Sequence, residues 1–311
     1  MKVVVTGGAG FIGANLCRRL LSGGADEVVA LDDLSTGIAA NLDGVDVELV
    51  RGDMGDPDVL DAVLPGARSV VHLGARPSVP RSIDDPLASH HANATGTLQV
   101  LEGVRRHAVP HVVVASSSSV YGQNPTLPKH EELTPMPMSP YAVSKLATEA
   151  YALSHAVCFD VGVLAFRFFN VFGPLQPAGH AYAAVVPAFV AAAIAGEPVT
   201  VHGDGEQTRD FTYVGSVCDV IAATVRDGVV SERPVNLAFG GRSSLLEVLT
   251  VLEKILGRPI ERTHTAPRVG DVRDSQADQT NLRARFPGIE PVELEDGLRR
   301  TVAWFETGAV G

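Results

Sequence analysis

Cysteine is scarce in this chain of 311 residues. Only Cys17, Cys158 and Cys218 occur, and their spacing matches no zinc-binding pattern. An odd number of cysteines also excludes a complete disulfide framework, which fits a reducing compartment. We therefore expect three small buried side chains, a cytoplasmic protein and no metal site.

Basic residues are also few. The sequence has 25 Lys and Arg against 36 Asp and Glu, which gives a formal net charge of −11. Surfaces that bind nucleic acid need clustered positive charge, so we expect no nucleic-acid partner.

No hydrophobic run is long enough to span a membrane. Residues 181–195 are apolar, but the run is shorter than the roughly 20 residues needed and Pro187 interrupts it. A buried helix is the expected structure there. Residues 1–5 begin as a strand and lack the pattern of a signal peptide, so no membrane partner is expected.

Short β-branched segments alternate with helix-length segments in the first half of the chain. Such apolar strands are typical of a buried parallel sheet, and the alternation predicts an α/β fold, a Rossmann-type doubly wound parallel sheet. Gly- and Pro-rich connections after residue 167 predict a smaller α/β substrate-binding lobe. The predicted strands are 3–5, 27–31, 45–50, 69–73, 111–114 and 161–166, and the predicted helices include 12–21, 95–107 and 141–158.

A glycine-rich turn follows the first predicted strand. Gly7, Gly10 and Gly13 have the spacing G-x-x-G-x-x-G and lead into a helix. Glycines allow backbone to approach a pyrophosphate closely, and the helix N-terminus offers free N–H groups. Asp32 follows Gly13 by 19 residues, where a carboxylate binds a ribose diol and repels a 2′-phosphate. NAD is therefore favoured over NADP.

These motifs set the expected domain boundaries. Residues 1–166, with 210–234, form the predicted NAD-binding Rossmann domain, and 167–209 with 235–311 form the second lobe. Further cofactor contacts are predicted from their position beside the glycine turn and after the second and third strands: Phe11, Ile12, Asp33, Ser35, Thr36, Gly37, Asp53 and Met54.

Tyr141 and Lys145 lie at the start of a predicted helix that Ser139 can cap and Pro140 can open. Four residues apart, they share one face and can point at one substrate hydroxyl. We expect the Lys145 ammonium to lower the pKa of Tyr141, so that a phenolate acts as base. A serine run at 116–119 follows a buried strand, where the substrate is expected.

Together these motifs resemble the extended short-chain dehydrogenase/reductase family, specifically its nucleotide-sugar epimerases and dehydratases, over nearly the whole chain. The matching pieces are T-G-G-x-G-F-I-G, the serine run before V-Y-G, Y-x-x-x-K, and residues 167–174, 203–211 and 268–271. The resemblance implies that Ser117 binds the sugar O4, Tyr141 removes its proton and Lys145 holds the nicotinamide ribose. NAD then takes a hydride from C4 and returns it to the other face of the 4-keto sugar.

The same resemblance implies further contacts and a homodimer. Helices near 95–107 and 141–158 would form the dimer contact. Implied NAD contacts are Leu73, Gly74, Ala75 and Asn93; implied diphosphate contacts are Asn170, Arg209 and Arg268; implied nucleotide contacts are Val185, Val186 and Asp271.

The expected reaction depends on Ser118 and Ser119. The family's 4,6-dehydratases carry an acidic pair there and its decarboxylases a glutamate, so this chain resembles a UDP-sugar 4-epimerase. A net oxidoreductase or dehydratase, and a non-catalytic NAD-sensing protein of the same fold, are the other hypotheses.

The sugar is less narrowly predicted. Ser78 and Val79 resemble epimerases that handle UDP-N-acetylglucosamine, and Ser275 stands where glucose-restricted members carry a bulky Tyr. Asn170 and Pro177 differ from the Thr and Arg typical of glucuronate-specific members. A UDP-hexose or UDP-N-acetylhexosamine is favoured, with UDP-glucuronate as the alternative because the serine-rich loop could hold a carboxylate.

Overall fold

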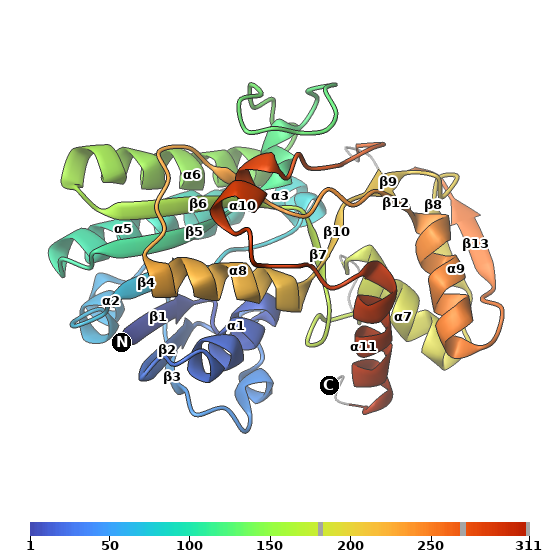
Figure 1. Cartoon of the computed structure of the whole chain (residues 1–311), viewed down its shortest axis with the longest axis horizontal. Coiled ribbons are helices and arrows are strands. Elements are labelled where there is room, and N and C mark those ends of the chain that lie inside the picture. Colours follow the sequence, from blue (N-terminus) through green and yellow to red (C-terminus); the bar gives the residue numbers. More distant parts are fainter. Residues whose placement is uncertain (180–182, 268–271, 309–311) are drawn as a thin grey trace.

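A computed structural model describes residues 1–179, 183–267 and 272–308. Its centre is a seven-stranded parallel sheet of order β11-β6-β5-β4-β1-β2-β3 (Figure 1). The strands are β1 (Lys2–Thr6), β2 (Glu27–Asp32), β3 (Glu48–Arg51), β4 (Ser69–His72), β5 (His111–Ser117), β6 (Gly162–Phe168) and β11 (Val235–Leu237).

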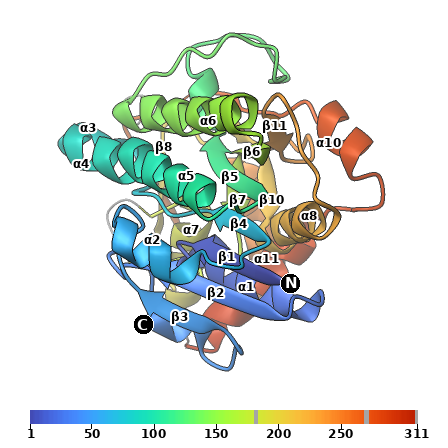
Figure 2. The same ribbon diagram turned by 90° about the vertical axis from the view of Figure 1, so that its left-hand side faces the viewer.

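Helices cover both faces of this sheet (Figure 2). The first face carries α1 (Phe11–Ser22) and α8 (Val214–Asp227), and the other carries α2 (Pro57–Val63), α5 (Gly96–Arg106) and α6 (Pro140–Phe159). Successive strand residues alternate between the two cores: Val3 and Val5 belong to one apolar cluster and Val4 to the other. The predicted Rossmann-type doubly wound sheet is confirmed.

Helix α6 begins where its sequence predicts. The Ser139 Oγ accepts a hydrogen bond from the Ala142 N–H at 3.1 Å, and Pro140 opens the first turn. Short helices α3 (Val79–Asp84) and α4 (Pro86–His90) precede a π-helical turn, His91–Thr95, that leads into α5. Single 3₁₀ turns lie at Ala39–Leu42 and Ser118–Tyr121.

The second lobe combines small sheets with helices, at the right of Figure 1. Its parallel pairs are β7 (Asn170–Phe172) with β10 (Phe211–Tyr213) and β8 (Val199–His202) with β13 (Arg262–Thr265), and its antiparallel pair is β9 (Thr208–Arg209) with β12 (Ser243–Ser244). Its helices are α7 (Val185–Ala195), α9 (Leu245–Leu256) and α11 (Leu294–Glu306), while α10 (Thr280–Arg285) packs against β11.

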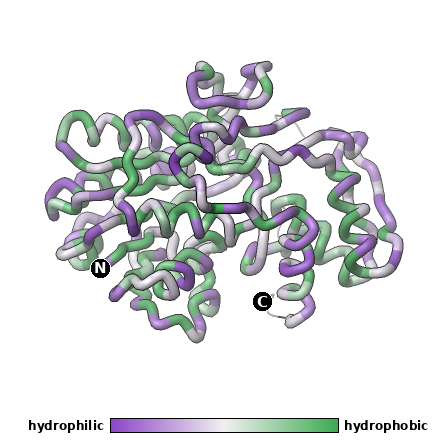
Figure 3. Tube along the Cα trace, viewed as in Figure 1, coloured by the Kyte–Doolittle hydropathy of each residue, from purple (hydrophilic) through white to green (hydrophobic). Residues whose placement is uncertain are grey.

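Two details refine the sequence-based expectations. Strand β11 pairs with β6, so residues 235–237, which we assigned to the second lobe, belong to the central sheet. The apolar run near 181–195 contains α7, and no helix in the described part of the chain is long and apolar enough to cross a membrane. Hydrophobic stretches follow the central strands in the hydropathy-coloured trace (Figure 3).

Candidate active site

The glycine-rich turn between β1 and α1 is built by close backbone contact. Gly7 has a φ of +69°, a region that favours glycine, and a Cβ at Gly13 would lie 2.1 Å from the Gly7 carbonyl oxygen. Gly10 caps α1 without a side-chain hydrogen bond. The first N–H groups of α1 are therefore offered to a ligand, as a bound pyrophosphate requires.

Asp32 ends β2 directly beside this turn. Its Oδ2 accepts from the Ala9 N–H at 3.0 Å and its Oδ1 from the Leu34 N–H at 2.9 Å. Burial raises the pKa of this carboxyl, and the two backbone donors oppose that rise. A Cβ at Gly37 would lie 2.6 Å from Asp32 Oδ1. The close glycines and the buried carboxylate therefore fit a dinucleotide with an unmodified ribose diol.

The other predicted residues near Asp32 are less enclosed. Asp33, Ser35 and Thr36 are exposed, and the Ser35 hydroxyl donates to Asp33 Oδ1 at 2.6 Å. Asp53 is exposed and accepts from the Gly55 N–H at 2.7 Å. These hydrogen bonds stabilise the conformation of the two loops. The role of these four residues in cofactor binding stays a prediction.

The loop after β4 adjoins the glycine turn. The Leu73 N–H donates to the Thr6 carbonyl at 3.1 Å, and a Cβ at Gly74 would lie 2.3 Å from the Met54 sulfur. The segment from Leu73 to Ala75 and Met54 are therefore placed beside the turn. The chain reverses its winding between β1 and β4, which is where ligands bind in open α/β sheets.

Asn93 supports this region from beneath. Its side chain is fully buried, its Oδ1 accepts from the Arg76 N–H at 2.7 Å, and its Nδ2 donates to the Ser144 Oγ at 2.9 Å. We predicted Asn93 as a direct NAD contact. In the structure its amide joins the loop after β4 to α6, and the contact with NAD stays a prediction.

Ser117 and Tyr141 are brought together at the end of the sheet. Strand β5 extends beyond the predicted residue 114 to Ser117, because its serines pair with β6. The Ser117 Oγ accepts from the N–H of Ser119 at 3.2 Å and from its Oγ at 2.9 Å. Its own proton remains for Tyr141, to which Ser117 is hydrogen-bonded.

Lys145 lies one helical turn after Tyr141. Its Nζ donates to the Ala115 carbonyl at 2.8 Å, and burial lowers its pKa to about 8. Burial raises the pKa of Tyr141, and the hydrogen bond from Ser117 opposes that rise. Our expectation that Lys145 lowers this pKa is not met in the described structure, because the ammonium is directed at Ala115.

A buried ion pair beneath these residues was not predicted. Glu149 Oε1 accepts from Arg167 Nη2 at 2.7 Å, and Glu149 Oε2 accepts from Arg167 Nε at 2.9 Å and from Ser116 Oγ at 2.9 Å. Arg167 lies 4.7 Å from the Tyr121 ring centre. The available signal was the position of Glu149, four residues after Lys145 and hence on the same helix face.

The structure has one cavity within the second lobe and another between that lobe and the first domain. The second-lobe cavity, about 230 Å³, has Val185, Val186, His202 and Gln207 among its lining residues. The catalytic-side cavity, about 240 Å³, is lined by Val79, Ser118, Ser119, Ser139, Ala142 and Ser275, among others.

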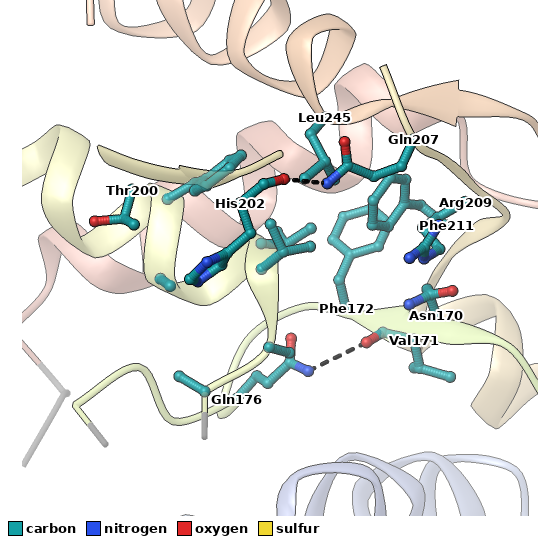
Figure 4. A pocket seen from close by; sticks show the side chains of 16 residues that line it. Asn170, Val171, Phe172, Gln176, Thr200, His202, Gln207, Arg209, Phe211 and Leu245 are labelled. Carbon is teal, nitrogen blue, oxygen red and sulfur yellow. Dashed lines mark hydrogen bonds between the residues drawn. The ribbon is translucent and has the colours of Figure 1, made fainter. Parts of the chain in front are cut away.

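Asn170 and Arg209 line both cavities. Figure 4 shows them together at one end of the second-lobe cavity, with His202 toward the other. Arg209 is buried, and its Nη1 donates to the carbonyls of Thr208 and Arg273 at 2.9 Å each. A guanidinium held in this way suits a diphosphate that bridges the two cavities.

The remaining predicted substrate residues fall into two groups. Ser78 has a φ of +97°, caps α3 by accepting from the Arg81 N–H at 3.4 Å, and directly precedes the cavity residue Val79. Arg268 and Asp271 lie outside the described residues.

Lys129 also lines the catalytic-side cavity, and sequence reasoning did not predict it. It is buried, its ammonium donates to the Asn124 carbonyl, and burial lowers its pKa. Within residues 1–179, 183–267 and 272–308, no carboxylate pairs with it. No signal in the sequence indicated the burial of Lys129, since a lone lysine in a polar loop is usually solvated.

Comparisons with known proteins agree with this geometry. The model of the NAD dependent epimerase/dehydratase family matches residues 3–238. A UDP-glucose 4-epimerase of Mycolicibacterium smegmatis is 37% identical, covering 98% of both chains. The UDP-N-acetylglucosamine 4-epimerase of Methanobrevibacter ruminantium, solved with UDP-N-acetylmuramic acid, superposes with a TM-score of 0.93 at 34% identity, covering 99% of this chain and 98% of that one. The UDP-glucose 4-epimerase of Thermus thermophilus, solved with NAD, gives 0.89 at 34% identity over 100% of both chains.

With its glycine turn, its Ser117–Tyr141 contact and these matches over nearly its full length, the chain is an enzyme of the NAD-dependent epimerase/dehydratase family and uses NAD.

Proposed function

We propose that this enzyme is a UDP-hexose or UDP-N-acetylhexosamine 4-epimerase. The observation that carries the proposal is the pair of cavities joined at Asn170 and Arg209, with the neighbours of Ser117 and Tyr141 lining only one of them. A nucleoside in one cavity and a sugar in the other would leave the diphosphate at the shared residues. That placement brings the sugar to the catalytic pair.

In this proposal the residues of the chain transfer one proton, that of the sugar O4 hydroxyl. Tyr141 takes the proton of the sugar O4 and later returns it, acting as general base and then general acid. Ser117, oriented by its two hydrogen bonds from Ser119, has one proton to donate: it donates to Tyr141 while no sugar is bound, and to O4 once the sugar occupies the site. Bound NAD supplies a reversible hydride acceptor for C4. Lys145 contributes positive charge beneath the site and a donor for the cofactor's ribose.

Epimerisation is favoured over dehydration by the composition of the catalytic-side cavity. Ser118 and Ser119 provide hydroxyls, which cannot act as the acid that eliminates water. Among its described lining residues the carboxylate is Asp274, whose Oδ1 accepts from Thr208 Oγ1 and from Arg242. The chemistry should therefore stop at oxidation and return.

Ser275 favours an N-acetylated sugar within this class. It is a small, buried residue of the cavity wall, and its N–H is fixed by the Thr208 carbonyl at 3.0 Å. A compact side chain there leaves room for an acetamido group.

One observation supports UDP-glucuronate as a second candidate. A buried ammonium without a carboxylate partner is costly, and the described structure gives Lys129 only the Asn124 carbonyl. A sugar carboxylate in this cavity would complete the missing pair, beside the hydroxyls of Ser118 and Ser119.

The test is a substrate panel with purified enzyme and no added NAD. UDP-glucose, UDP-N-acetylglucosamine and UDP-glucuronate are incubated separately, and C4 epimers are resolved by chromatography and NMR. We expect one sugar to reach a reversible mixture, and Tyr141→Phe to lose this activity while retaining NAD. A keto product, steady reduction of NAD, or no conversion of any sugar would refute the proposal.

We also propose a cytoplasmic homodimer. Exposed apolar side chains gather on α4 and α6, where Leu87 is 71% and Val157 is 87% exposed, with Val143 and Phe159 also exposed. The predicted contact included α5, yet the described α5 contributes no exposed large apolar side chain. Light scattering after gel filtration tests the dimer, and Val157→Glu should weaken it. Cys17 and Cys218 are buried as expected, whereas Cys158 is exposed, contrary to our expectation; three free cysteines suit a reducing compartment.

A further inference from the structure

We propose that His72 is a positioning residue that connects the NAD-binding loop after β4 to the catalytic helix α6 through one fixed tautomer. The proposal rests on the NAD site described above and on the proposed role of Tyr141. Neither the glycine turn nor the Ser117–Tyr141–Lys145 set includes this residue.

The imidazole is enclosed between two threonine hydroxyls. His72 is the last residue of β4 and is 2% exposed. Its Nδ1 lies 2.7 Å from Thr6 Oγ1 and its Nε2 lies 2.9 Å from Thr97 Oγ1. Burial, with a smaller effect of the Lys145 charge, lowers its pKa to about 3, so the ring is neutral wherever the protein is folded and active.

The hydrogen-bond directions select one tautomer. Thr97 Oγ1 lies 2.5 Å from the Asn93 carbonyl, which can only accept, so the single Thr97 proton is used there. Thr97 must then accept from His72 Nε2–H. The Nδ1 is left as acceptor, and Thr6 donates to it. Thr6 Oγ1 in turn accepts from the Gly74 N–H at 3.2 Å.

One end of this path lies in the cofactor site. Gly74 packs against the glycine turn so closely that a Cβ on Gly7 would lie 2.8 Å from the Gly74 nitrogen. The direction of the Gly74 N–H is therefore set through Thr6 by the imidazole. A shift of this loop would move the surface against which NAD binds.

The other end lies beside the catalytic tyrosine. Thr148 Oγ1 on α6 shares the Asn93 carbonyl at 3.2 Å, and the Asn93 side chain donates to Ser144 Oγ at 2.9 Å. Ser144 Oγ donates to the Tyr141 carbonyl at 2.8 Å. A continuous buried path therefore joins Gly74 to the turn of α6 that presents Tyr141.

The chain contains a matched control at the opposite end of the same strand. Ser69 Oγ lies 2.8 Å from His111 Nδ1, and His111 Nε2 lies 3.1 Å from the Val229 carbonyl. Burial lowers the pKa of this histidine too. Ser69 and His72 are separated by about 10 Å along β4 at ~3.3 Å per residue. The two histidines thus share burial and bonding, but only His72 adjoins the NAD loop.

The experiment measures NAD release from purified holoenzyme diluted into an NAD scavenger, together with the melting temperature. We expect His72→Leu to release NAD about tenfold faster, the equivalent of one buried hydrogen bond. Thr97→Val, a milder change on α5, should raise release in the same direction. The double variant Thr6→Val with Thr97→Val should release NAD only slightly faster than the faster of the two single variants, because both substitutions act through the His72 imidazole.

The control variants separate positioning from general stability. His111→Leu and Ser69→Ala should lower the melting temperature and leave NAD release unchanged. Equal effects of the two histidine changes on NAD release, or no effect of His72→Leu and Thr97→Val, would overturn the proposal. Because release is measured without turnover, absence of epimerisation would refute the proposed function and leave this inference standing.

Discussion

The Glu149→Gln variant tests how far the catalytic serine depends on the ion pair beneath it. Glu149 and Arg167 are 4% and 2% exposed, and they meet through two hydrogen bonds of 2.7 and 2.9 Å. Glutamine keeps the size and one acceptor but removes the charge. The Arg167 guanidinium would then be buried without a counter-charge, which costs about 3–5 kcal/mol in unfolding free energy.

Removing one charge of this pair should destabilise the protein more than replacing both charges. Glu149→Leu combined with Arg167→Met replaces both charges by apolar groups, and such replacements are often close to neutral. We therefore expect the double variant to be more stable than Glu149→Gln. Activity provides a second readout: Ser116 donates to Glu149 Oε2 directly before Ser117, so kcat should fall more than KM rises.

Urea unfolding at a fixed NAD concentration measures the stability change, because bound NAD adds its own stabilisation. The control is Glu132→Gln, which removes an ion pair with Arg233 whose side chains are 71% and 70% exposed. Its expected cost is below about 1 kcal/mol. If Glu149→Gln costs no more than this control, the buried pair does not stabilise the site as argued.

Three further predictions follow from the site. Gly13→Ala should abolish NAD retention because its Cβ would meet the Gly7 carbonyl at 2.1 Å, whereas Gly288→Ala, with nothing within 4 Å, should retain NAD; equal NAD contents would contradict this. The pKa of Lys145 is lowered to about 8, so kcat/KM should decline as pH rises above about 8 and the ammonium is lost, while Lys145→Arg should lack that decline; a wild-type rate that keeps rising would refute the assignment. The same lowered pKa means that the unfolded chain binds this proton more tightly, so its contribution to stability improves between about pH 8 and the ordinary value of 10.5. Lys129→Met should reduce kcat/KM for UDP-glucuronate about tenfold or more and leave UDP-glucose nearly unchanged, as steady-state assays would show; an equal loss for both sugars would remove the second candidate.

Features set by local pattern were predictable from the sequence. The strand–helix alternation, the Gly7–Gly13 turn and the placement of Asp32 depend on residues close together in the chain, where backbone geometry leaves few alternatives. The start of α6 at Pro140 followed from capping chemistry for the same reason.

Features set by tertiary packing were not predictable. Arg167 meets Glu149 only because β6 passes beneath α6, and Lys129 is buried only because its loop reaches the segment at 276–278. The bonds of Asn93 were not predictable either: its amide joins the backbone of Arg76 to the Ser144 hydroxyl, and its contact with NAD stays a prediction. The direction of the Lys145 ammonium likewise depends on where the Ala115 carbonyl ends β5.

On the proposed arrangement, the residues shared by the two cavities separate the binding of the nucleotide from the recognition of the sugar. Asn170 and Arg209 would hold the diphosphate, so that the nucleoside stays bound in the second-lobe cavity while the 4-keto sugar rotates in the catalytic-side cavity and presents its opposite face. Tight binding of the nucleoside and rotation of the sugar thereby take place in separate cavities. Substitutions in the wall of the catalytic-side cavity alone would then change the preferred sugar during evolution. The contacts that hold the diphosphate of every substrate would stay the same.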